Sequence, residues 1–376
     1  MTAHCISGSI TTLRAHVDAI DPNAVLVLTG GRSFEGSGAA PHVRSALAGR
    51  DVTFLHDVPA DPTLEDVTSA VAVFRSASPA LVVAVGGGSV IDLAKAVRVI
   101  GPTSTSPAAF LRGDHEIERP GPPLVAIPTT AGTGSEATRY AVFTVDGEKR
   151  PMAHRALLPD YVILDPELTS SLPPAVTAAT GLDALSQAME SIWSTRSTVP
   201  SSSDARAALG LALTHLPSAV HDPTPESRSA MCTAAHLAGR AIDVSATTAP
   251  HALSFHLTTD YGVAHGHAVA LTLGAVLAYN AEVTDDDCAD PRGPQHVRRV
   301  IADILDLLGV ATPADAHAYL DGLVGDLGLE PTLAGVGVVS SEQRRALAAS
   351  ASPMRMATNP RRFDEESLEA LVASLR

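Results

Sequence analysis

The chain has 376 residues, of which 45% are hydrophobic and 18% are charged. These proportions support a large buried core and argue against a disordered chain. The 26 basic and 41 acidic side chains give a net charge of −15, which argues against a protein that binds nucleic acid. No apolar run reaches the length of about 18 residues that a membrane span requires.

The N-terminal segment lacks the basic and apolar regions of a secretory signal. Cys5, Cys232 and Cys288 lie far apart and show no paired spacing, which excludes a zinc finger and a disulfide framework. We therefore expect a cytoplasmic protein with neither nucleic-acid nor membrane partners.

The first half of the chain alternates short apolar runs with helical patterns. Strands are expected at 24–28, 52–55, 81–85 and 124–128, and helices at 64–74 and 90–100. Continuous β-branched runs between helices are typical of a parallel sheet covered on both faces. We expect an α/β dinucleotide-binding domain, Rossmann-like, over residues 1–166.

From about residue 173 the chain is rich in alanine and leucine at helical spacing. Helices are expected at 174–193, 203–220, 226–245, 265–280, 295–308, 315–327 and 341–350. The polar stretch 197–203 is expected to form a mobile loop, and the proline-rich segments 121–123 and 222–225 are expected to be loops. We expect an all-helical domain over residues 167–376.

A glycine turn follows the apolar run 81–85. Gly86, Gly87, Gly88 and Ser89 precede the predicted helix, and free N–H groups at a helix start suit a phosphate. The alternative is a tight turn in which Ser89 caps the helix and Asp92 completes a capping box.

Two further segments follow predicted strands and are candidates for ligand contact. After strand 24–28, Gly30 is followed by Arg32 and Ser33, and an arginine here suits a 2′-phosphate. The alternative is an ordinary surface turn. After strand 124–128 comes the hydroxyl-rich loop 128–138, which includes Thr129, and ligands bind at this end of parallel strands.

A metal constellation is predicted in the helical half. Asp183 and Gln187 are four residues apart and share one helix face. The segment 250–269 contains His251, His256, His265 and His267. On one straight helix His251 and His265 would lie about 21 Å apart, but a break at 258–262 would let the chain fold back. One carboxylate with two imidazoles suits Fe²⁺ or Zn²⁺.

Together these segments resemble the iron-containing, or group III, alcohol dehydrogenases. The resemblance covers nearly the whole chain and rests on GGGSVIDLAKA (86–96), PTTAGTGSEAT (128–138), LLPDYVILDPELT (157–169), TGLDALSQAMES (180–191) and GVAHGHA (262–268). It implies a dinucleotide-binding domain, a helical domain and an active site in the cleft between them.

The resemblance also implies a ligand set. Asp183, His251 and His265 match three metal ligands of the family, and Gln187 stands where a histidine is usual. Gln187 is therefore either a weak fourth ligand or no ligand. Phe255 stands where many members have a histidine, so His256 or His267 is expected to deliver the proton.

The cofactor residues follow from the resemblance in the same way. Gly87, Gly88 and Ser89 are expected at the pyrophosphate. Further contacts are expected from Asp92, Thr130, Thr133, Lys149 and Leu168. Gly30 replaces an aspartate of NAD-preferring members, so we expect NADPH to be preferred over NADH.

Within the family, the turn at 29–33, Gln187 and the segment 250–268 most resemble the phosphonoacetaldehyde reductases, enzymes of phosphonate biosynthesis. This implies reduction of phosphonoacetaldehyde to 2-hydroxyethylphosphonate, with hydride from nicotinamide and a metal polarising the aldehyde. Candidate phosphonate contacts are Arg139, Arg150, Arg361 and Arg362. The family and the base rate for oligomers lead us to expect a homodimer.

Four alternatives remain open. In the first, the substrate is another small aldehyde, such as a semialdehyde or a simple alkanal. In the second, the enzyme is metal-free and resembles maleylacetate reductases. A lyase resembling 3-dehydroquinate synthase would show no net cofactor turnover. A non-catalytic dinucleotide sensor would have no reason to carry Asp183, His251 and His265 together.

Overall fold

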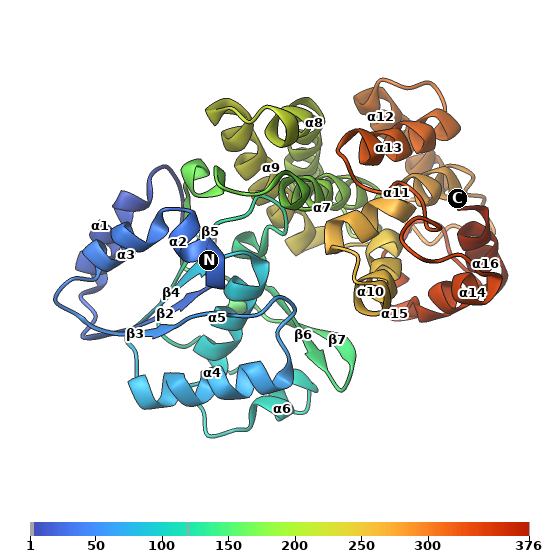
Figure 1. Cartoon of the computed structure of the whole chain (residues 1–376). Helices are drawn as coiled ribbons and strands as arrows, with labels where there is room; N and C mark the ends of the chain where they lie inside the picture. Colours follow the sequence, from blue (N-terminus) through green and yellow to red (C-terminus); the bar gives the residue numbers. More distant parts are fainter. Residues whose placement is uncertain (1–3, 119, 376) are drawn as a thin grey trace. The chain divides into compact units, whose positions relative to one another are not determined.

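The computed structural model describes residues 4–118 and 120–375. The chain forms two compact units, residues 1–172 and 173–376, which divide a few residues after position 166. The first unit is built on a parallel sheet with the strand order β1-β8-β5-β4-β2-β3 (Figure 1). Its strands are β1 (His4–Ser7), β2 (Ala24–Thr29), β3 (Asp51–Leu55), β4 (Leu81–Gly86), β5 (Leu124–Pro128) and β8 (Tyr161–Leu164).

The sheet confirms the four expected strands and adds the short strands β1 and β8. Alternate side chains of the central strands enter two separate cores: Leu26 and Val82 face one, and Val25 and Val83 face the other. The first core is covered by α4 (Leu64–Ala77), α5 (Gly88–Ile100) and α6 (Pro107–Leu111). The second is covered by α1 (Leu13–Ile20), α2 (Gly31–Gly36) and α3 (Ala39–Ala46).

The strand order reverses at the neighbouring strands β2 and β4. The chain leaves β2 towards one face of the sheet and leaves β4 towards the other. A reversal of this kind opens a ligand crevice at the carboxyl ends of the strands. The segments 29–33 and 86–89 lie at those ends.

An antiparallel hairpin, which the sequence analysis does not anticipate, follows the loop 128–138. It consists of β6 (Tyr140–Val145) and β7 (Glu148–Ala153). Asp146 and Gly147 form its turn and both have positive φ, as the two-residue hairpin turn requires. Short 3-10 helices complete the unit at Ile10–Thr12, Ser135–Ala137, Arg155–Leu157 and Pro166–Thr169.

The second unit is helical, as expected. It contains α7 (Pro174–Trp193), α8 (Val199–His221), α9 (Pro225–Ser245), α10 (Ala249–Tyr261), α11 (His265–Ala281), α12 (Pro294–Leu308), α13 (Pro313–Asp326), α14 (Ser341–Ser350), α15 (Pro353–Met356) and α16 (Glu365–Ser374). The helix α7 lies at its centre, packed against α8, α9 and α11 (Figure 1). It is buried along almost its whole length, so polar side chains on it need partners.

Two local predictions are wrong. The stretch 197–203 is not a loop, because α8 begins at Val199 and Thr198 and Ser201 form a capping box there. Helix α10 also continues through 258–261 and ends at Gly262, whose φ of 67° is the left-handed conformation of a helix C-terminus. The chain still folds back, and α10 packs against α11.

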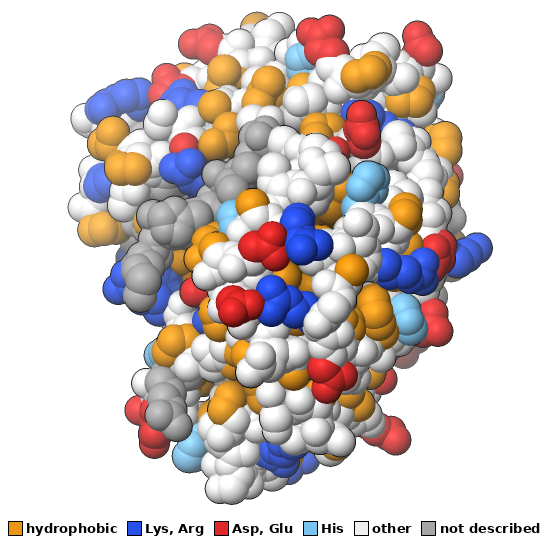
Figure 2. Space-filling view, turned by 90° about the vertical axis from the view of Figure 1, so that its left-hand side faces the viewer, with side chains coloured by type: hydrophobic (Ala, Val, Ile, Leu, Met, Phe, Trp, Pro, Cys, Tyr) orange, Lys and Arg blue, Asp and Glu red, His pale blue; other side chains and the backbone are white. Residues whose placement is uncertain are grey.

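Charged side chains of both signs are interspersed on the face of the molecule shown in Figure 2. Exposed ion pairs of the first unit include Arg14 with Asp18 and Arg44 with Glu35. Within the described residues, no helix combines the length and apolar character of a membrane span. Cys232 and Cys288 are free thiols.

Candidate functional site

The glycine turn follows the end of β4, the strand that pairs with β2. Helix α5 begins at Gly88 with Gly87 as its N-cap, and no side chain caps it. The alternative in which Ser89 caps the helix and Asp92 completes a capping box is therefore wrong. Gly87 has no side chain to cap the first N–H groups of α5, and a helix start of this kind suits a phosphate.

The hydroxyl-rich loop packs directly against this turn. A Cβ atom added to Gly88 would lie 2.8 Å from Oγ1 of Thr133, and one added to Gly87 would lie 3.4 Å from Thr130. Only glycine permits this close approach at Gly88. The hydroxyl of Thr129 is buried and has no hydrogen-bond partner among the described residues. Turn and loop thus form one polar cradle.

Asp92 supports the loop rather than the turn. Its carboxylate accepts hydrogen bonds from Oγ of Ser135, at 2.5 Å, and from N–H of Val142, at 2.9 Å. The buried ammonium of Lys95 donates to Ser135 and Thr138. Burial raises the pKa of Asp92, although the Lys95 charge opposes that rise. These hydrogen bonds connect the loop to α5 and hold it in place.

Lys149 is connected to the glycine turn through Asp61. Its ammonium lies 2.6 Å from the carboxylate of Asp61, whose N–H donates to Oγ of Ser89 at 3.2 Å. The structure therefore brings Lys149 and Ser89 together. Leu168, by contrast, packs in the hydrophobic core under α1–α3.

The turn after β2 lies beside the glycine turn. Cβ atoms added to Gly30 and Gly86 would both meet the side chain of Val90, so the two turns flank one residue. Arg32 is exposed. The sequence analysis overlooked Asp57, which follows β3: its Oδ1 would lie 2.7 Å from a Cβ atom on Gly31. Strand pairing of β2 with β3 brings this acid beside the turn.

The helical unit brings Asp183, His251 and His265 together from α7, α10 and α11. One ligand atom from each lies within 4.8 Å of the others. The Nε2 atoms of His251 and His265 lie 3.3 and 4.0 Å from Oδ1 of Asp183. Phe255 packs its ring against His265, with the ring centroids 6.1 Å apart.

A glycine permits this convergence. A Cβ atom added to Gly266 would lie 2.1 Å from the carbonyl oxygen of Ala179 and 2.6 Å from Cβ of Asp183. Helix α11 therefore approaches α7 with backbone against backbone, which brings the adjacent His265 to Asp183. The preceding turn at Gly262 reverses the chain so that His251 faces the same point.

Two more polar residues of α7 border the trio. Nε2 of Gln187 donates to Oδ1 of Asp183 at 3.1 Å. The completely buried Glu190 contacts Nδ1 of His251 through Oε1. Sequence analysis did not single out Glu190, although it lies seven residues after Asp183 and hence on the same helix face.

The site is electrostatically negative. Burial alone would lower the pKa of His251, but the carboxylates of Glu190 and Asp183 outweigh it and raise that pKa to about 10. Burial would raise the pKa of Asp183, whereas its contacts with His251, His265 and Gln187 keep it below the ordinary value. The buried carboxylates of Asp183 and Glu190 thus favour a positive charge beside them.

The other candidate histidines contact different groups. Nε2 of His267 lies 2.7 Å from the carbonyl oxygen of Glu330. Nδ1 of His256 lies 3.0 Å from the carboxylate of Asp260, one turn further along α10. The structure does not bring either ring into the trio.

The candidate phosphonate contacts come from both units. Arg139 is half-buried before β6, and Arg150 pairs with Glu148. Arg361 donates to Asp287 at 2.7 Å and to the carbonyl of Tyr279 at 2.8 Å, and its guanidinium lies over the Tyr279 ring.

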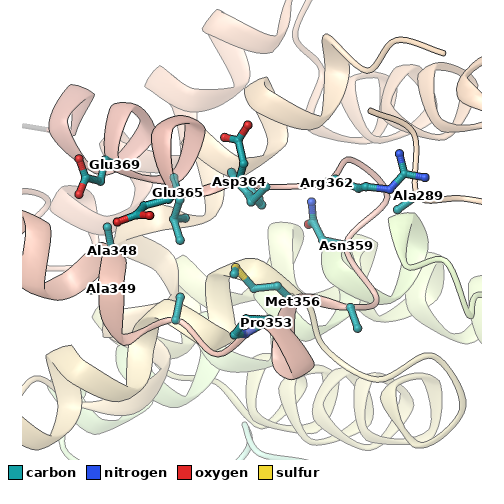
Figure 3. A pocket seen from close by; sticks show the side chains of 14 residues that line it. Ala289, Ala348, Ala349, Pro353, Met356, Asn359, Arg362, Asp364, Glu365 and Glu369 are labelled. Atoms are coloured by element: carbon teal, nitrogen blue, oxygen red, sulfur yellow. The ribbon is translucent and has the colours of Figure 1, made fainter. Parts of the chain in front are cut away.

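Arg362 lines a cavity of about 590 Å³ formed by α14, α15 and α16 (Figure 3). Apolar side chains such as Met356 and Leu368 form part of its wall, and Asp364, Glu365 and Glu369 add acidic groups. None of the trio residues lines it.

The trio has the properties of a metal site. Nε2 of His251 is buried and makes no hydrogen bond within the described part of the chain, so it has a lone pair to offer when deprotonated. One carboxylate oxygen and two imidazole nitrogens are ligands that Fe²⁺ and Zn²⁺ accept. The cradle at Gly87 and Gly88, with the buried hydroxyl of Thr129, equally suits a dinucleotide phosphate.

Comparison with known proteins agrees with both halves of the chain. The family model "Iron-containing alcohol dehydrogenase" matches residues 2–166. The model "Fe-containing alcohol dehydrogenase family, C-terminal" matches residues 177–375.

Individual relatives align along most of their length. The phosphonoacetaldehyde reductase of Streptomyces viridochromogenes is 37% identical over 91% of this chain and 87% of its own. The long-chain-alcohol dehydrogenase 1 of Geobacillus thermodenitrificans is 33% identical over 94% and 91%. The crystal structure of sulfoacetaldehyde reductase from Bifidobacterium kashiwanohense in complex with NAD⁺ superposes with a TM-score of 0.86 at 31% identity, covering 100% of this chain and 96% of that one.

The sheet-and-helix architecture, the trio, the two family models and these relatives all lead to one assignment. The chain belongs to the iron-containing alcohol dehydrogenase family, whose members are oxidoreductases that act on CH–OH groups.

Proposed function

We propose that this protein is a metal-dependent, NADPH-preferring reductase of phosphonoacetaldehyde. The observation that carries the proposal is the convergence of Asp183, His251 and His265, in a chain whose relatives include reductases of phosphonoacetaldehyde and sulfoacetaldehyde. Both names denote a short aldehyde that bears a tetrahedral anionic group. That shared chemistry favours such a substrate over a simple alkanal.

The helical unit supplies the metal site in this proposal. Asp183, His251 and His265 would hold Fe²⁺ or Zn²⁺, with the amide oxygen of Gln187 as a weak fourth ligand. When bound, such an ion polarises a carbonyl oxygen and stabilises the negative charge that develops there. Because His256 and His267 contact Asp260 and Glu330, we infer that water supplies the proton of the product alcohol.

The first unit supplies the cofactor site. The start of α5 and the loop at Thr129–Thr133 would bind the pyrophosphate and nicotinamide portions. Gly30, Arg32 and Ser33 would receive the adenosine ribose, and the exposed guanidinium of Arg32 suits a 2′-phosphate. This preference for NADPH is limited by the carboxylate of Asp57 beside Gly31.

The anionic group of the substrate needs a cationic partner. Arg361 donates to Asp287 and to the Tyr279 carbonyl, and Arg362 donates to the Asp286 carbonyl at 3.0 Å, so all four candidate arginines are tested by substitution. Replacing the correct one by glutamine should raise KM for phosphonoacetaldehyde and leave KM for butanal unchanged.

The deciding experiment compares NADPH oxidation with phosphonoacetaldehyde, succinic semialdehyde, butanal and acetaldehyde, before and after chelation. Strong preference for the phosphonate, lost on chelation and restored by Fe²⁺ or Zn²⁺, supports the proposal. Activity on simple aldehydes alone would contradict the substrate. Activity that survives complete removal of metal would contradict the metal site. Size-exclusion chromatography tests the homodimer that we also propose.

A further inference from the structure

Glu190 is a buried acid that the proposed mechanism leaves unused. Its side chain is completely inaccessible to solvent. Oε2 accepts hydrogen bonds from N–H of Thr248 at 2.5 Å and from Oγ1 of Thr248 at 2.9 Å. Oε1 contacts Nδ1 of His251. Both oxygens are thus engaged, and burial of this charge is compensated by three polar partners.

These contacts determine which nitrogen of His251 is available. An ionised carboxylate only accepts hydrogen bonds, so Nδ1 must carry a hydrogen towards Glu190. With that hydrogen in place, deprotonated Nε2 presents its lone pair towards Asp183, 3.3 Å away. Metal-binding histidines generally have their second nitrogen held in this way, often by a carboxylate that also increases the basicity of the ring.

The same carboxylate holds the helix that carries His251. Thr248 is the residue immediately before α10, and its hydroxyl also accepts a hydrogen bond from Nε1 of Trp193 at 2.9 Å. Glu190 and Trp193 both belong to α7, the helix that carries Asp183. Glu190 therefore orients the ring and anchors the start of α10 against the helix of another ligand.

We propose that Glu190 is a positioning residue for the metal site: it holds His251 in the tautomer and orientation that direct Nε2 to the ion. The inference rests on the proposed metal site. It predicts that loss of the carboxylate weakens metal binding by about 10- to 100-fold.

The variant Glu190→Gln tests this chemistry with almost no change in shape. A glutamine has a single acceptor oxygen, whereas Thr248 and His251 both require one. If the amide oxygen accepts from Thr248, its NH₂ group faces Nδ1 and drives the hydrogen of His251 onto Nε2. If it accepts from His251, the NH₂ group opposes the N–H of Thr248 and displaces the start of α10. Either outcome impairs the ligand.

The control is Ser191→Ala. Ser191 is the next residue on α7, is equally buried, and accepts a hydrogen bond from Ser245 at 2.8 Å. Metal-free wild type and both variants would be titrated with Co²⁺ against a chelator of known affinity, and the ligand-field absorption of bound Co²⁺ recorded. Thermal unfolding and NADPH binding verify the fold.

The inference is supported if Glu190→Gln binds Co²⁺ 10- to 100-fold more weakly with an altered spectrum, as expected for loss of an outer-shell carboxylate, while Ser191→Ala matches wild type. Wild-type affinity in folded Glu190→Gln overturns it and leaves the proposed function intact. Wild type that binds no Co²⁺ overturns the proposed metal site itself. If Glu190→Gln does not fold, Glu190→Asp, whose shorter carboxylate draws away from His251, is subject to the same criterion.

Discussion

Asp183 and His265 come from different helices, and truncating each one removes a different ligand group from the site. Asp183 supplies the only negative charge of the trio, and His265 supplies an imidazole that is 31% exposed. We expect Asp183→Ala and His265→Ala each to lower kcat by about 10³-fold or more, since stabilisation by a bound ion is worth several kcal/mol. Steady-state kinetics with added metal measure this loss.

The control for these two variants is dinucleotide binding. The cofactor site that we propose lies in the first unit, so NADPH titration by fluorescence should give unchanged affinity. Variants that retain near-normal turnover would contradict a metal-centred mechanism. Variants that lose both properties would indicate misfolding rather than loss of a ligand.

Arg32 and Asp57 are expected to have opposite effects on the choice of cofactor at the turn after β2. A guanidinium attracts a 2′-phosphate, whereas a carboxylate repels it and suits the free ribose hydroxyls. We expect Arg32→Ala to lower the NADPH-to-NADH ratio of kcat/KM by about tenfold, and Asp57→Asn to raise it by a similar factor. Initial rates with both cofactors measure the ratio. Shifts in the same direction would show that the two side chains do not flank the ribose.

At the scale of the element, the contact of α11 with α7 depends on Gly266. A methyl group there would lie 2.1 Å from the Ala179 carbonyl, so Gly266→Ala must push the two helices apart. We expect a loss of stability of about 1–3 kcal/mol, typical of overpacking, together with weaker metal binding because His265 moves with α11. Chemical denaturation and Co²⁺ titration measure the two effects.

Gly210 provides the matched control for Gly266. It also lies within a helix, α8, but a Cβ atom added there would meet nothing within 4 Å. Gly210→Ala should leave metal binding unchanged and stabilise the protein by up to about 1 kcal/mol through helix propensity. Equal behaviour of the two variants would contradict the packing argument.

The helices and strands themselves were largely predictable. The spacing of apolar residues located α7 and α14 at their observed bounds, because an almost fully apolar or regularly amphipathic pattern is a local property. The start of α8 was missed because Thr198 and Ser201 resemble loop residues, although the same residue types form capping boxes. The hairpin β6–β7 had a usable signal in its Asp146-Gly147 turn.

At the scale of the whole molecule, Asp287 and Arg361 join segments far apart in the chain. Burial would raise the pKa of Asp287, but the N–H of Thr284 and the guanidinium of Arg361 lower it below the ordinary value. A carboxyl group with a lowered pKa stabilises the fold above its unfolded pKa of about 3.9, and this stabilisation disappears as the pH falls through the folded value.

The variant Asp287→Asn should therefore cost about 1–2 kcal/mol of unfolding free energy at pH 7. The difference from wild type should begin to shrink below about pH 4, where the carboxyl of the unfolded chain takes up protons, and should fall further as the pH passes the lower pKa of the folded state. Urea denaturation across pH measures it, with Asp285→Asn, which removes an exposed charge nearby, as the control. A difference that is constant with pH would contradict the assigned role of the charge.

The sequence by itself indicated the α/β and helical halves through local periodicity, and it indicated the family through motifs of fixed order and spacing. The same motifs singled out Asp183, His251 and His265 as candidate metal ligands, and the fold brings these three together. Only the tertiary structure decided which groups those residues meet. Strand pairing brought Asp57 to the turn after β2, and helix packing brought Glu190 to His251. Packing also brought Arg361 into a hydrogen bond with Asp287, and His267 into contact with the carbonyl of Glu330. Such partners lie dozens of residues apart, and no local pattern encodes which pairs the folded backbone brings into contact.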